Sequence, residues 1–191
     1  ADGSFSISFP ALPDEKIDAA AQPIFTYNIE ASVTDINGET HEANTSVSVG
    51  YTSLQLSLDN ARQDLMRVDS TVRFVLSSSN LNNEPVPTNV QWKIVALQTP
   101  NRLLRNRYWS APDTATLDKA SFVQRFPHDP YLNEDDMRSW PLGKQLLSDT
   151  VNTGSNNRIQ IPAGSLPAGM YALQFSATDK DGQPVSGQHI F

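Results

Sequence analysis

Apolar residues in this 191-residue chain recur mostly at every second position. The clearest runs lie at 25–33, 72–76, 90–96 and 171–175. Because successive side chains of a β-strand point to opposite faces, a period of two indicates strands with one buried face. Stretches rich in Asn, Asp, Gly and Pro separate the runs at the spacing of an all-β sandwich. Further strands are expected at 5–9, 47–49, 54–58, 159–161 and 185–190.

One strand and the turn that follows it occur twice. Residues 27–38, YNIEASVTDING, match residues 171–182, YALQFSATDKDG, in character at every position, at an offset of 144 residues. A repeat longer than one domain suggests two similar units. Too few strands accompany the first copy to complete a sandwich. We therefore predict that residues 1–52 are the C-terminal strands of one sandwich and that residues 53–191 form a complete second one.

Several aromatic residues are predicted to be structural. Tyr171 begins the penultimate strand, where Ig-like sandwiches use a tyrosine that bonds back to the upstream backbone. Tyr27 is its counterpart in the first copy. Trp92 lies in a strand near the middle of the second unit and is the expected central core aromatic, whose indole N–H needs a partner.

The turn of each copy begins like a calcium-binding loop, DING at 35–38 and DKDG at 179–182. An EF-hand loop needs a bidentate glutamate at its twelfth position, which here is Ser46 or Ile190. We therefore interpret both as hairpin turns with glycine at positive φ, and keep calcium as the alternative. The structural residues of these turns are Asp35, Gly38, Asp179 and Gly182.

The segment from about 98 to 149 is longer than a compact sandwich connection requires, and such loops are usually functional or packed on themselves. Thr116 or Asp118 could cap a short helix within it, with Phe122 and Phe126 on the apolar side, ending at Pro127. We therefore expect a long, partly helical insertion that is docked.

Three arginines of this segment, Arg102, Arg105 and Arg107, are possible cleavage points for a trypsin-like protease and could serve as bait. The alternative is that they lie over Tyr108 and Trp109 or pair with the acidic residues at 134–136. The many aromatic residues favour packing, with Trp109 as a structural residue.

Composition removes several kinds of chemistry. The chain has no cysteine, so it can form no disulfide, thiol nucleophile or thioester of its own. Its three histidines form no zinc motif, and no nucleophile elbow or nucleotide-binding loop is present. Acidic residues at 134–136 beside Asp129 could hold a cation, but such a run is more often a solvated helix start. We expect no enzymatic activity, no cofactor and no metal.

The net charge of −7 lies entirely in residues 1–52, which carry eight acidic residues and one basic residue. Residues 53–191 are balanced. Neither part offers the basic face that a nucleic-acid binder needs, and an acidic segment repels anionic lipid. No stretch approaches the roughly 20 apolar residues of a membrane span. We expect neither nucleic-acid binding nor direct membrane insertion.

The stretch FTYNIEASVTDINGET at 25–40, closed by VSVGY at 47–51, resembles the end of a macroglobulin-like domain of bacterial alpha-2-macroglobulins. The remainder is similar to the domain that follows in large cell-envelope members of that family. The motifs that carry this similarity are V-x-W-x-I at 90–94, R-x-W-x-x-P-D at 107–113, F-x-x-x-F-P-x-D-x-Y at 122–131 and W-x-x-G at 140–143. The resemblance covers essentially the whole chain and implies an Ig/fibronectin-like (macroglobulin-like) β-sandwich.

Members of this family resemble protease traps, in which a bait segment is cut, the sandwich domains rearrange, and a Cys–Gln thioester in a distant domain couples to the protease. The resemblance implies a non-catalytic scaffold segment of such an endopeptidase inhibitor. Its partners would be neighbouring domains of the parent chain and, through the parent, target proteases. The implied location is the cell envelope, periplasmic or surface-anchored through the parent chain.

The alternative function is a generic cell-surface β-sandwich module that binds glycan or protein. A row of exposed aromatic residues on one sheet, or a groove at a sheet edge, would favour it.

Overall fold

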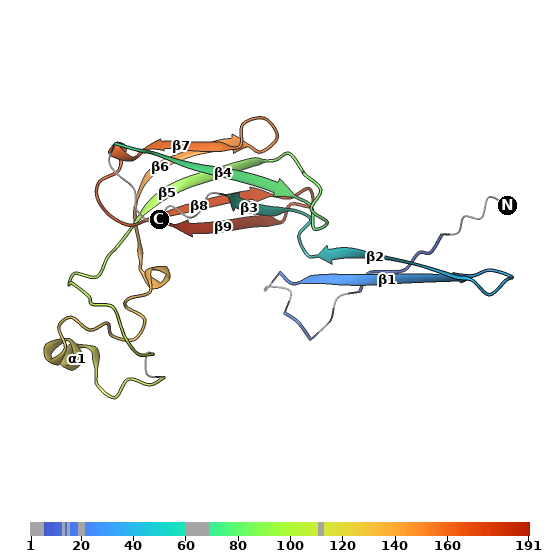
Figure 1. The fold of residues 1–191 in the computed structure, drawn as a ribbon. Helices are drawn as coiled ribbons and strands as arrows, with labels where there is room; N and C mark the ends of the chain where they lie inside the picture. The colour runs from blue at the N-terminus through green and yellow to red at the C-terminus, as the bar shows by residue number, and fades with distance from the viewer. Residues whose placement is uncertain (1–5, 13, 15, 19–21, 60–68, 111–112) are drawn as a thin grey trace.

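The computed structural model describes residues 6–12, 14, 16–18, 22–59, 69–110 and 113–191. Three parts follow one another in it (Figure 1). A long hairpin leads into a two-sheet sandwich, and a mostly irregular excursion, residues 98–141, leaves the sandwich and returns to it.

The hairpin consists of β1 (Ile24–Thr34) and β2 (Thr40–Gly50), paired antiparallel from Thr34↔Thr40 to Ile24↔Gly50. Aromatic and β-branched residues at alternate positions of β1 favour an extended strand. They place Phe25, Tyr27 and Ile29 on one half-buried face, while the intervening polar residues are exposed.

Within the described residues, the sandwich has seven strands in two sheets. One sheet has the order β3-β4-β7, with β3 (Gln55–Asp59), β4 (Thr71–Ser79) and β7 (Arg158–Pro162). The other has the order β6-β5-β8-β9, with β5 (Asn89–Leu97), β6 (Leu142–Asn152), β8 (Tyr171–Thr178) and β9 (Pro184–Ile190). All neighbouring strands are antiparallel, so the prediction of an all-β antiparallel sandwich is confirmed.

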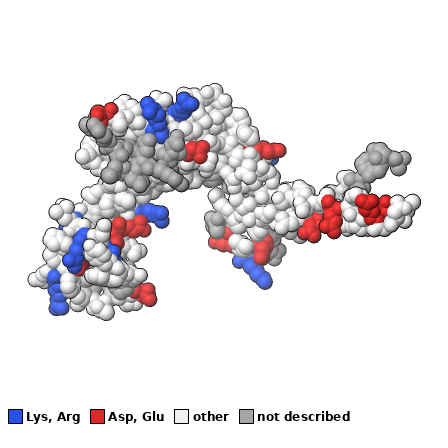
Figure 2. Space-filling view, in the orientation of Figure 1, with Lys and Arg blue, Asp and Glu red and all other residues white. Residues whose placement is uncertain are grey.

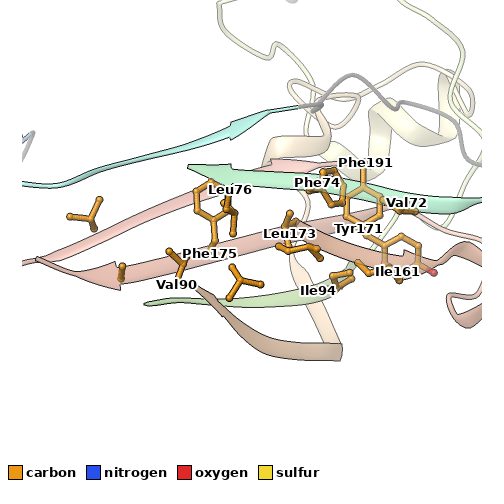
Figure 3. Close-up of a cluster of buried hydrophobic side chains, with 14 of the residues drawn as sticks. Val72, Phe74, Leu76, Val90, Ile94, Ile161, Tyr171, Leu173, Phe175 and Phe191 are labelled. Atoms are coloured by element: carbon orange, nitrogen blue, oxygen red, sulfur yellow. The ribbon is translucent and has the colours of Figure 1, made fainter. Parts of the chain in front are cut away.

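The core lies between these two sheets (Figure 3). Its largest fully buried side chains come from alternate positions of facing strands: Phe74, Leu76, Ile94, Ile159, Ile161, Leu173, Val72 and Val90. Full burial of one such side chain stabilises a fold by about 1.5–3 kcal/mol. Phe191 closes one end, with its ring centroid 5.2 Å from that of Phe74 and 5.7 Å from that of Tyr171.

The strand expected at 5–9 does not form within residues 6–9, and residue 5 lies outside the described residues. The sequence ISFP at 7–10 resembles IQIP at 159–162, which is strand β7. β7 owes its hydrogen bonds to β4, its partner in the sheet. Residues 6–9 have no such partner in the described part of the chain, and a lone strand cannot satisfy its backbone groups.

The expected insertion also ends earlier than residue 149. Leu142 begins the edge strand β6, which pairs with β5 through two register irregularities near Val95. These irregularities and the exposure of an edge strand interrupt the period-two pattern that identified the other strands.

The irregular segments contain short helices. α1 (Lys119–Arg125) begins at Asp118, whose Oδ1 accepts a hydrogen bond from the backbone N–H of Ser121 at 3.0 Å, and it ends at Phe126, before Pro127. The 3₁₀ turns are η2 (Met137–Ser139) and η3 (Ala163–Ser165). None of the helices in the described ranges is long and apolar enough to cross a membrane.

Candidate functional site

Buried arginines organise the excursion. The Arg102 guanidinium donates to the carbonyls of Pro127, at 2.8 Å, and Asp129, at 2.9 Å, and it also pairs with the carboxylate of Glu134. Its side chain is only 16% exposed. One guanidinium thereby ties the first irregular stretch of the excursion to the loop that follows α1.

Arg107 and Arg105 repeat this arrangement. Arg107 donates to the carbonyls of Pro130, at 2.9 Å, and Leu132, at 2.6 Å, and its side chain is 11% exposed. Arg105 forms a two-point pair with the carboxylate of Asp129, and its side chain is 62% exposed. A protease could place Arg102 or Arg107 in its specificity pocket only after these bonds had broken. The contacts therefore favour the packing interpretation of these arginines over the bait interpretation.

Glu134 is the centre of this network. Its carboxylate accepts from Arg102, from Lys119 Nζ at 3.2 Å and from the backbone N–H of Tyr131 at 3.1 Å, while its carbonyl accepts the indole N–H of Trp140 at 2.9 Å. Burial acts to raise the pKa of Glu134, but these hydrogen bonds outweigh it and hold the pKa below its usual value. Glu134 therefore stays ionised at neutral pH and joins Arg102, Lys119 and the Tyr131 backbone at one carboxylate.

An aromatic cluster lies on the other side of this network. Phe122 packs against Phe126 and Tyr131, with centroid distances of 5.3 and 5.4 Å. A mostly apolar pocket of about 260 Å³ opens beside these rings and is bordered by Trp109, which is largely exposed, and by the Arg105–Asp129 pair. Trp109 thus lies at the rim of a pocket and not in the core. Pro112, part of the same sequence motif, lies outside the described residues.

The junction between hairpin and sandwich is built around Asp179. Its Oδ2 accepts the backbone N–H of Ser53 at 2.8 Å and the Ser53 hydroxyl at 3.1 Å. The N–H of Ser53 is the largest cause of the lowered pKa of Asp179. The turn between β8 and β9 is thereby bonded to the segment that connects β2 with β3.

A second contact joins β2 to the turn between β4 and β5. The backbone N–H of Ser48 donates to Asn82 Oδ1 at 2.9 Å. Gly50 permits this close approach, because a Cβ there would lie 3.1 Å from Leu81 Cδ1 and 3.2 Å from the carbonyl oxygen of Pro23. The hairpin is thus held at two places along its base.

The two Asp-Gly turns share one geometry. Asp35 Oδ1 accepts the N–H groups of Asn37 and Glu39 at 2.8 and 2.9 Å, and these bonds lower its pKa. Asp179 Oδ1 accepts the equivalent groups of Asp181 and Gln183 at 2.9 and 2.8 Å. Both glycines have a φ of +81°, the left-handed conformation in which glycine carries no steric cost: Gly38 and Gly182.

A third turn shares this geometry, in the Asn- and Pro-rich stretch from residue 80 that the sequence already indicated as a turn, although its likeness to the other two was not predicted. Asn80 Oδ1 accepts the N–H groups of Asn82 and Glu84, both at 2.9 Å, and Asn83 takes the positive φ of 63°. Its sequence NLNNE differs from DINGE only by the exchange of Asp and Gly for Asn and of Ile for Leu. Asparagine tolerates this conformation better than most residues, which was the available signal.

The hydroxyls of the two repeat tyrosines both donate to an upstream carbonyl, which lies four residues away for Tyr171 and fifteen for Tyr27. The Tyr171 hydroxyl donates to the carbonyl of Pro167, and the Tyr27 hydroxyl donates to that of Leu12. Tyr171 is buried, and burial raises the pKa of its phenol. Tyr27 is half-buried and packs against Phe9 in a tilted arrangement, with ring centroids 5.6 Å apart.

Trp92 lies on β5, an inner strand of its sheet, opposite Asp149 of β6 and Phe175 of β8. It is half-buried and packs against the core. Its indole nitrogen is buried, and no acceptor for it lies among the described residues.

Charges and donor sets point to no ion site in the part of the chain that the structure describes. No group of three or more His, Asp or Glu residues is arranged to hold a metal there. Glu134 and Asp135 face arginines, and Asp136 caps η2 by accepting the N–H of Arg138 at 3.0 Å. Acidic side chains line the hairpin, whereas the excursion mixes both signs (Figure 2).

No family model matches the chain, and no match was found among curated proteins or solved structures.

Proposed function

We propose that the chain is a non-catalytic scaffold segment of a bacterial alpha-2-macroglobulin-like protease inhibitor, or trap. In this proposal residues 1–52 are the last strands of one Ig/fibronectin-like, macroglobulin-like sandwich, residues 53–191 are the next sandwich, and the excursion is an insertion in it. The chain would have no enzymatic activity of its own.

The observation that carries the tandem arrangement is the register of the two hairpins. Thr34 pairs with Thr40 in the first, and Thr178 pairs with Pro184 in the second. Residues 178 and 184 lie 144 positions after residues 34 and 40, which is the offset between the two sequence copies. Equal register and turn geometry support the interpretation of β1–β2 as the counterpart of β8–β9.

Strand order supports the Ig/fibronectin-like type. A three-stranded sheet that faces a four-stranded sheet, with a buried tyrosine at the start of the penultimate strand, agrees with that architecture. The expected role follows from the junction, where Asp179 bonds Ser53 of the connecting segment and Ser48 of β2 bonds Asn82. Such a pair of units can transmit a displacement as one stiff body, as a scaffold in a rearranging trap would need to do.

The proposed partners are the neighbouring domains of the parent chain and, through the parent, target proteases. The proposed location is the cell envelope, either periplasmic or surface-anchored through the parent.

The test of this function uses the native full-length parent. It is incubated with a broad-specificity protease, and activity is then measured on a small peptide and on a large protein. If the parent is a trap, the bound protease no longer cleaves the large substrate but still cleaves the small peptide. The mobility of the parent on a native gel also changes. Plain digestion of the parent, or equal activity on both substrates, would contradict the proposal.

The second candidate is a generic cell-surface module that binds glycan or protein. The exposed rings of Tyr108 and Trp109 beside the apolar pocket favour it. Loss of ligand binding in Trp109→Ala with an unchanged trap assay would separate the two functions.

A further inference from the structure

The outer edge of β1 occupies the position that β5 covers in the second copy of the repeat. β5 pairs with β8 from Gln91↔Ser176 to Ala96↔Tyr171. The equivalent positions on β1, 144 residues earlier, are 27–32. In the described part of the chain only β2 pairs with β1, so this edge has unpaired backbone groups.

The face beside this edge is apolar and lacks the cover that its counterpart has. Val33 and Val47 are 58% and 37% exposed, whereas the equivalent residues, Ala177 and Phe191, are 9% and 6% exposed. The second copy obtains its burial from the opposing sheet and from β5. The first copy presents the same pattern of side chains without them.

Side-chain size on β1 and β2 favours a bulky residue on the missing strand. In the second copy Trp92 lies opposite Phe175, whose ring covers Gly187 so closely that a Cβ there would clash. The residues equivalent to Phe175 and Gly187 are Ala31 and Ala43, which also pair with each other. Loss of the phenyl ring leaves room above Ala31 for a large apolar side chain.

Charge adds a second condition. Lys93 of β5 lies opposite Gln174 of β8. The equivalent of Gln174 on β1 is Glu30, an exposed carboxylate on the polar face. A basic residue at the position of Lys93 would therefore meet an opposite charge, and such cross-strand pairs are stabilising.

We propose that the free edge of β1 is a strand-acceptor site. It takes one antiparallel β-strand, supplied by the parent chain from outside residues 1–191, with a bulky apolar side chain opposite Ala31 and a basic one opposite Glu30. Backbone hydrogen bonds supply the affinity of such strand addition, and alternate side chains supply its specificity. This inference rests on the proposed tandem arrangement.

The test uses the 191-residue chain and a fluorescent peptide of residues 89–97, NVQWKIVAL, which has Trp and Lys at the two required positions. We expect saturable binding of one peptide per chain by fluorescence anisotropy, and none by a scrambled peptide. Glu30→Lys should weaken binding at least about threefold, and a peptide with Lys93→Glu should restore it. Glu42→Lys on β2 is the matched control and should bind the original peptide unchanged.

Ala31→Trp should abolish binding, because it fills the space above β1. If that variant unfolds, the charge exchange at Glu30 decides the matter alone. Equal binding of the scrambled peptide, or equal effects of Glu30→Lys and Glu42→Lys, would overturn the proposal. A concentration-dependent dimer that excludes the peptide would also overturn it, in favour of edge-to-edge pairing of two copies. A parent that traps proteases while its chain ignores the peptide would refute this inference and leave the proposed function standing.

Discussion

Tyr171 and Tyr27 each bond an upstream carbonyl, in different surroundings. The Tyr171 ring lies in the sandwich core and its hydroxyl bonds the Pro167 carbonyl, whereas Tyr27 bonds Leu12 beside a half-exposed sheet. The first bond should therefore contribute to the stability of the sandwich, and the second should not.

Tyr171→Phe should lower the free energy of unfolding of the sandwich by about 1 kcal/mol, the typical contribution of one such hydrogen bond. Tyr27→Phe removes the same hydroxyl outside the core and serves as the control, with little expected change. Urea denaturation followed by tryptophan fluorescence measures both. Equal losses in the two variants would show that the corner bond has no special role in the sandwich.

Residue types with strong local preferences could be predicted from the sequence. Asp118 caps a helix and Gly38 takes positive φ because these preferences depend on nearby backbone alone. The roles of Arg102 and Arg107 could not be predicted fully, because most of their acceptors are main-chain carbonyls, which every residue carries. Trp92 met the periodic pattern of a core residue and packs against the core, but the period alone does not give its partial exposure.

At the scale of elements, Asp179 closes its own turn and also bonds the segment that leads into the sandwich, whereas its counterpart Asp35 only closes its turn. One carboxylate oxygen of each closes the turn, but only in Asp179 does the other bond the connecting segment, at Ser53. The Asn80 turn shows that an amide can close the same turn.

Asp179→Asn should therefore keep the turn but place an NH₂ group where the Ser53 N–H needs an acceptor. We expect exchange of the Ser53 amide hydrogen to accelerate about tenfold, and Asp35→Asn to leave it unchanged. Because the folded pKa of Asp179 is lowered, its stabilising effect is complete above the unfolded pKa and is lost as pH falls through the folded one. Acidification should therefore lower the protection factor of the Ser53 amide, which is its intrinsic exchange rate at that pH divided by the observed rate, as the variant does. A protection factor independent of both changes would contradict this role.

The excursion depends on Glu134 in a comparable way. Glu134→Gln removes the charge that Arg102 and Lys119 share, so the segment should open more often. Limited trypsin digestion should then cut after Arg102 at least about tenfold faster than in the unchanged chain, and Glu42→Gln, an exposed control on the hairpin, should not change the rate. Rapid cutting after Arg102 in the unchanged chain would instead favour the bait interpretation.

Strand prediction succeeded where both partners are inside the chain and the strand is half-buried. β4 and β5 have alternating buried side chains and were found by period alone. β6 was missed because its edge position and irregular pairing break the period. The segment 5–9 has the alternating pattern of a strand. Residues 6–9 form no strand, because no partner strand among the described residues hydrogen-bonds to them.

At the scale of the whole molecule, the acidic hairpin and the sandwich differ in how complete they are. The sandwich buries its apolar side chains between two sheets, whereas the hairpin exposes part of its apolar face. Our account attributes this difference to strands that the parent chain supplies. The hairpin should then become as well protected as β8–β9 in the parent.

Hydrogen exchange of the β1 amides, measured by mass spectrometry in the parent and in the 191-residue chain, tests this claim most directly. The account predicts that residues 24–34 exchange at least about a hundredfold more slowly in the parent, approaching the rates of β8, while the sandwich core exchanges equally in both. Equal, fast exchange of β1 in both proteins would contradict the tandem-sandwich account.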